Sequence, residues 1–131
     1  METTTPSSDD TPRTRLGARL VRAATSDRDR IAARALAEER TVLAVHQVAS
    51  ALLVVQGGRT VLRWEGLMGK LYTLPLDPGQ RAFLGLVMSM VGIGSVTIAA
   101  VAELDTERLR IITQAILRLA GDDSIAIATR L

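Results

Sequence analysis

The longest uncharged stretch of the chain, residues 82–102, dominates the pattern of hydrophobic and polar positions. No charged residue lies between Arg81 and Glu103, so this segment of about 21 residues is long enough to cross a bilayer as one helix. The buried centre of a small domain has the same pattern. Most functional interpretations of the chain depend on which of these two environments the segment occupies.

The clearest local helix signal stands just before this stretch. Asp77 is a good N-terminal cap, Pro78 suits the first helical position, and Gln80 has the spacing of a capping box. Apolar residues recur at helical spacing as far as position 91, and Gly92 is placed to end or bend the helix. We therefore predict a central buried helix that includes residues 83–91, in which a charge at a core position would unfold the domain.

A long first helix is predicted to begin after Ser26, a good cap, and to end at Gly57. Its first half is amphipathic, whereas residues 41–58 carry no formal charge and should be largely buried. The alternative for its end is a pair of short strands, residues 52–55 and 59–62, around a glycine turn.

The C-terminal part of the chain contains another well-marked helix. Asp105 or Thr106 can cap it, helical periodicity extends to Ala120, and Gly121 is placed to end it. Residues 96–104 before it fit a strand as well as a helix, and residues 124–131 alternate as in a short terminal strand. The predicted buried stripe of the helix consists of Leu109, Ile112, Ile116 and Leu119.

Together these elements predict a mainly helical fold, a small bundle with a short C-terminal strand that gives it some α+β character. Residues 26–131 are expected to form a single helical domain, and residues 1–25 a disordered basic tail. The end of this tail is interpreted as a solvated linker in preference to an arm that binds nucleic acid or a membrane surface. Its basic residues are Arg13, Arg15, Arg19 and Arg22.

Composition narrows the classes of function. Aromatic residues make up 2% of the 131 residues, which argues against binding of single-stranded nucleic acid by base stacking. The net charge of +2 indicates no large positive field, and the chain has no cysteine for disulfides or thiolate metal sites. No apolar segment follows the first residues as in a secretory signal, so we expect a cytoplasmic location. The abundance of Ala, Arg, Val and Leu is typical of a high-GC bacterial genome.

His46, the only histidine, is the first candidate for chemistry. Ser50 lies one helical turn later, within reach of its ring. A general base also needs an orienting acid, and no carboxylate lies within one turn of His46. We therefore expect a core or interface histidine and predict a protein without enzymatic activity.

Neither glycine pair forms a nucleotide-binding loop. Gly92 and Gly94 would begin a dinucleotide fingerprint, but Thr97 stands where its third glycine belongs, and Gly57 and Gly58 have no following Gly-Lys-Ser/Thr. No cofactor is predicted. The acidic residues near position 105 are interpreted as helix capping in preference to a metal site. They are Glu103, Asp105 and Glu107.

The most specific functional hypothesis is a helix-turn-helix over residues 95–120. Residues 103–105 give a turn of suitable length, and Ala99 would be the small residue where the two helices touch. Against this, Glu103 stands where glycine is usual, and Glu107 would face the phosphates. The apolar positions are Ile98, Ala102, Leu104, Leu109 and Ile112, and the residues offered to DNA are Thr106, Glu107, Arg108, Arg110, Thr113 and Gln114.

A membrane protein is the alternative. Residues 41–58 and 82–102 would form two transmembrane helices, with both termini in the cytoplasm according to the distribution of arginine. The favoured interpretation is a regulatory or interaction protein. Its predicted partners are DNA, another protein, or a second copy of the chain held through the long first helix.

Overall fold

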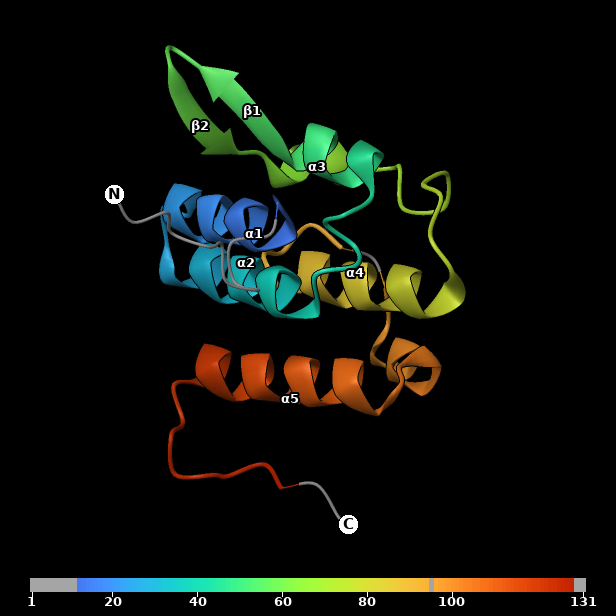
Figure 1. Cartoon of the computed structure of the whole chain (residues 1–131). Coiled ribbons are helices and arrows are strands. Elements are labelled where there is room, and N and C mark those ends of the chain that lie inside the picture. Colours follow the sequence, from blue (N-terminus) through green and yellow to red (C-terminus); the bar gives the residue numbers. More distant parts are fainter. Residues whose placement is uncertain (1–11, 95, 129–131) are drawn as a thin grey trace, which may run out of the picture.

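The computed structural model describes residues 12–94 and 96–128, in which helices form three layers (Figure 1). Helix α1 (Pro12–Ala23) packs against α2 (Asp27–Glu39). Helix α4 (Pro78–Met90) lies beside α2, and α5 (Thr106–Ala120) packs against both of them on the side away from α1. One two-stranded antiparallel sheet accompanies the helices, so the predicted mainly helical fold with some α+β character is confirmed.

The core lies between these layers and is centred on α4. Phe83, Leu84 and Val87 of this helix are fully buried, which confirms the predicted central buried helix. Each such side chain stabilises the fold by about 1.5–3 kcal/mol relative to an exposed one. The other fully buried large side chains are Leu20, Leu36, Val42, Val48, Leu52, Leu67, Ile111 and Ile112.

Helix α1 replaces the expected solvated linker, and this part of the prediction is wrong. Leu16 and Leu20 repeat one turn apart, and Leu20 is fully buried against the rest of the core. Gly17 lets the helix approach α2 so closely that a Cβ added to it would lie 2.9 Å from the Cβ of Ala37. Residues 1–11 of the predicted tail lie outside the described residues.

The long first helix ends much earlier than predicted. Arg40 adopts φ 72°, and its backbone N–H donates to the carbonyl of Leu36, which ends α2 after Glu39. The chain then turns into α3 (His46–Leu52) and a hairpin of β1 (Leu53–Gln56) and β2 (Arg59–Leu62). The alternative with two strands is therefore the correct one for this segment.

The register of the hairpin pairs Leu53 with Leu62 and Gln56 with Arg59. Gly57 and Gly58 both have positive φ, as a two-residue turn between antiparallel strands requires. A 3-10 helix, η2 (Trp64–Leu67), follows and packs against α3. The hairpin extends beyond α1 at one end of the molecule (Figure 1).

The predicted start and end of α4 are confirmed. Asp77 and Gln80 form the complete capping box, Pro78 is the first helical residue, and Gly92 takes φ 83° just after the helix. Within residues 12–94 and 96–128, no helix is both long enough and apolar enough to cross a membrane. Neither predicted span is one continuous helix, because turns and short elements interrupt both of them.

Residues 96–104, whose sequence fits a strand as well as a helix, contain a 3-10 helix, η3 (Ile98–Glu103). Helix α5 begins and ends as predicted, with Asp105 as its N-cap and Gly121 in the left-handed conformation. The predicted terminal strand is absent from residues 121–128, and residues 129–131 lie outside the described part of the chain.

Helix α5 buries a different face from the one predicted. Ile111, Ile112 and Ala115 face α2 and α4, so of the expected stripe only Ile112 is buried. The other three members remain about two-fifths exposed. Two of them lie at one edge of the face that the neighbouring helices cover, and the third is next to the last residue of the helix. These three are Leu109, Ile116 and Leu119.

Candidate functional site

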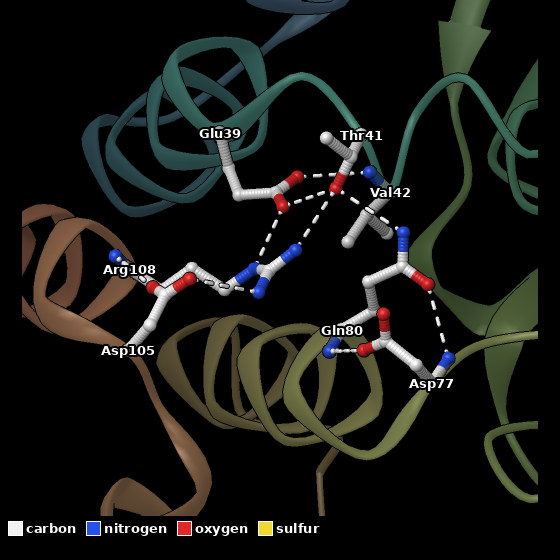
Figure 2. A network of polar contacts seen from close by, with 7 residues as sticks. All are labelled: Glu39, Thr41, Val42, Asp77, Gln80, Asp105 and Arg108. Carbon is white, nitrogen blue, oxygen red and sulfur yellow. Dashed lines mark hydrogen bonds and ion pairs between the residues drawn. The ribbon is translucent and has the colours of Figure 1, made fainter.

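A partly buried polar network joins the end of α2 to the beginnings of α4 and α5 (Figure 2). At its centre, Nε of Arg108 donates to Oε2 of Glu39 over 2.8 Å, and the side chain of Glu39 is only 3% exposed. The other carboxylate oxygen of Glu39 accepts from the backbone N–H of Val42 at 2.8 Å. The same carboxylate therefore holds the turn after α2 and anchors α5.

The hydroxyl of Thr41 lies between the three helix ends. It donates a hydrogen bond to Glu39. It also accepts two hydrogen bonds of 3.2 Å, one from Arg108 and one from the side-chain amide of Gln80. Gln80 in turn accepts from the backbone N–H of Asp77 at 3.0 Å. The capping box of α4, which sequence spacing predicts, is thus tied to the turn after α2 by a contact that spacing does not predict.

This network is closed within the fold. Each guanidinium nitrogen of Arg108 has a partner, since its third contact is with Asp105 at 3.2 Å. A site for chemistry needs groups directed at a substrate, whereas these side chains satisfy one another. The network fixes the relative positions of three helix ends, and we assign it a structural role.

The arrangement expected for a helix-turn-helix is not formed. Its first helix is replaced by η3, which packs against α4, and Ile98, expected at the contact between the two helices, is 70% exposed. Ala99, expected where the helices touch, is also exposed. The geometry predicted for residues 95–120 is therefore wrong, and Ser95 lies outside the described residues.

The residues that the sequence offers to DNA do not act together. Arg108 points inward to Glu39, whereas Thr106 and Arg110 are exposed on α5. Thr113 donates to the carbonyl of Leu109 at 2.7 Å, and Gln114 is half-buried. DNA binding by the four residues other than Arg108 stays a prediction.

Two of the three acidic residues near position 105, Asp105 and Glu107, make contacts within α5 itself. Asp105 accepts from the backbone N–H of Arg108 at 2.8 Å, as an N-cap does. Glu107 pairs with Arg110 at 2.9 Å, and the hydrogen bond from this guanidinium lowers the pKa of the Glu107 carboxyl. In the described part of the chain, no group of three His, Asp or Glu side chains could hold a metal ion.

The contact between His46 and Ser50 forms as its spacing allows, with Nε2 and Oγ 3.1 Å apart. His46 is exposed on α3, so it is not a core histidine, and its alternative role as an interface histidine stays a prediction. The pair borders a shallow hollow that Lys70 and Thr73 also line, and no carboxylate is among the described residues of this hollow. The pair therefore lacks the acid that would orient the imidazole in a catalytic triad.

Comparison of the chain with protein-family models, with curated proteins and with solved structures found no match. Function is therefore inferred from the side chains and surfaces of this chain.

Sequence reasoning missed two surfaces. One is the apolar edge of α5, made of Leu109, Ile116 and Leu119, which periodicity placed in the core. The other is the outer face of α1, where arginines were assigned to a linker. The repeat of Leu16 and Leu20 in the same segment was the available signal that this segment is helical.

Proposed function

We propose that the protein is a non-enzymatic interaction protein that self-associates through the apolar edge of α5. The observation that carries this proposal is the exposure of Leu109, Ile116 and Leu119, at 42%, 42% and 41%, along one helix. Large aliphatic side chains gathered on one exposed face are typical of an interaction surface. The helix behind them is fixed by its buried face and by the contact between Arg108 and Glu39.

A second copy of the chain is the partner that best complements this edge. Leu109 and Ile116 of this edge lie on one stripe of α5 with Thr113 and Ala120, at intervals of four, three and four residues. Leu119 lies beside this stripe. Large and small side chains alternate along this stripe. If two α5 helices pair in opposite directions about a twofold axis, Leu109 faces Ala120 of the other copy and Ile116 faces its Thr113. The stripe is therefore complementary to itself, as a twofold interface requires.

The test is the mass of the protein in solution, measured by size-exclusion chromatography with light scattering. We expect twice the chain mass of 14.1 kDa. Ile116→Lys should give the mass of one chain, because a charge would be buried in the interface. Gln114→Lys is the matched control, since it places the same side chain on the same helix but away from the stripe.

Circular dichroism should show that both variants keep their helical content, because neither replaced side chain is fully buried. A wild-type protein that stays monomeric at every concentration would overturn self-association. Equal loss of the dimer in both lysine variants would show that the apolar edge is not the contact.

A further inference from the structure

Three exposed arginines form one stripe along the outer face of α1. Arg15, Arg19 and Arg22 are spaced by four and three residues, so their side chains leave the helix in nearly the same direction. Leu20 and Gly17 lie on the opposite face and are buried against the other helices. The buried face of α1 thus fixes the helix on the protein, with the arginine stripe on its exposed face.

Among the described residues, no acidic side chain pairs with these arginines. The sequence between Pro12 and Ser26 contains no carboxylate, and no ion pair of the described residues involves any of the three. The charge imbalance extends along the chain from α1 to the end of the hairpin. Residues 12–63 contain ten arginines and four carboxylates, whereas residues 64–128 contain five basic and seven acidic residues. Residues 12–63 are therefore strongly basic, although the net charge of the whole chain is only +2.

A hollow of about 280 Å³ lies where α1 meets the hairpin, and Arg19, Arg22 and Thr60 line it. Thr60 is paired with Val55, which is 68% exposed and stands on the same side of the two-stranded sheet. An anionic oxygen in the hollow would meet two guanidinium groups and one hydroxyl. Guanidinium groups bind phosphate oxygens well because they offer planar pairs of N–H donors.

We propose that this α1 stripe, together with Thr60, binds the phosphate backbone of double-stranded nucleic acid without sequence preference. The stripe spans about 10 Å along the helix, given a rise of about 1.5 Å per residue. A row of separated charges suits a ligand whose charges also repeat, as the phosphates of a duplex do. A single phosphate or carboxylate group would engage only part of the row.

Two features favour a duplex over other polyanions. A basic amphipathic helix binds a bilayer by inserting its apolar face, but Leu20 is fully buried against the core. Single-stranded nucleic acid is held largely by stacking of bases on aromatic rings, and no aromatic residue lines the hollow. The stripe can therefore contact the phosphate backbone of the nucleic acid but not its bases.

The experiment measures fluorescence anisotropy of a labelled DNA duplex of arbitrary sequence during titration with the full chain, over a series of salt concentrations. Contacts to three phosphates predict a plot of log affinity against log salt with a slope of about −2.7, or roughly 40-fold weaker binding at 200 mM than at 50 mM salt. Arg19→Ala should reduce the steepness of this slope by about one.

Arg110→Ala is the matched control, because Arg110 is also an exposed arginine on a helix but lies on α5, in a different layer. If the α1 stripe is the contact, this variant leaves both affinity and slope unchanged, whereas the prediction that Arg110 of α5 contacts DNA requires it to weaken binding. Loss of binding in Arg110→Ala but not in Arg19→Ala would place the contact on α5 and overturn the proposal. Absence of wild-type binding at low salt would also overturn it.

Two further probes test whether the stripe binds a membrane surface or a single strand in preference to a duplex. Vesicles of phosphatidylcholine and phosphatidylserine that bind the protein when the duplex does not would overturn the proposal in favour of a membrane surface. An unpaired strand that binds more tightly than the duplex would also overturn it. Repeating the titration with Ile116→Lys keeps this result independent of self-association, because the α1 stripe is unchanged in that variant.

Discussion

Glu39 and Arg108 are separated by 69 residues in the sequence and form an ion pair 2.8 Å long, with their side chains 3% and 17% exposed. The pair joins the last residue of α2 to the first turn of α5. Because Glu39 also accepts from the backbone N–H of Val42, one carboxylate holds the turn after α2 and attaches α5 to it.

Replacing Glu39 should be strongly destabilising. Glu39→Ala leaves the guanidinium of Arg108 largely buried without its main partner and removes the acceptor for the N–H of Val42. Breaking a buried pair in this way costs about 3–5 kcal/mol of the free energy of unfolding. Urea denaturation followed by circular dichroism measures this difference.

Arg30→Ala is the control for that measurement. Arg30 and Asp27 are 2.9 Å apart, but their side chains are 53% and 95% exposed, so losing this pair should cost less than about 1 kcal/mol. Equal effects of Glu39→Ala and Arg30→Ala would show that burial does not strengthen the pair between Glu39 and Arg108.

The core assignment predicts a large effect at Leu84, which is fully buried in α4. Leu84→Ala should lower the free energy of unfolding by about 2–5 kcal/mol through lost contacts and the cavity it leaves. Leu84→Asp should unfold the domain, because a charge in this position has no partner. Thermal melting measures both variants, and an unchanged melting temperature in Leu84→Asp would refute the assignment.

The docking of α1 depends on the close approach at Gly17. A Cβ there would lie 2.9 Å from the Cβ of Ala37 and 3.2 Å from its Cα, so Gly17→Val forces the two helices apart. Overpacking of this kind costs about 1–3 kcal/mol. Limited digestion with trypsin should show faster cleavage after Arg19 than in the wild type, whereas Ala18→Val, at an exposed position of the same helix, should not.

A pH effect is expected in the turn after α5. Ser124 donates to Oδ1 of Asp122 from its hydroxyl at 2.6 Å and from its backbone N–H at 2.8 Å, and these bonds lower the pKa of the Asp122 carboxyl. A carboxyl with a lowered folded pKa stabilises the turn above its ordinary pKa, and that contribution is lost as pH falls through the folded value. A carboxyl titration by NMR should show this midpoint, and Ser124→Ala should move it upward. An unchanged midpoint in Ser124→Ala would contradict the assigned cause.

Elements with local boundary signals could be predicted from the sequence. Asp77 and Gln80 fix the start of α4 by contacts three residues apart, and Gly121 ends α5 because glycine adopts the left-handed conformation without steric cost. These contacts involve neighbours in the chain, so residue type and spacing are enough to reveal them. The mainly helical fold follows from the same local information.

What only the tertiary structure decided is which neighbours each segment meets. Helix α5 carries apolar side chains on several of its own faces, so its periodicity could not show which face is buried. In the structure α2 and α4 cover Ile111 and Ile112, while Leu109 and Ile116 stay partly exposed. Likewise, Arg108 looks like a surface cation in the sequence until Glu39 is brought to it from another helix. Contacts between residues close in the chain determine where the helices begin and end. Contacts between distant segments determine which face of each helix is buried, and therefore which surfaces remain for partners.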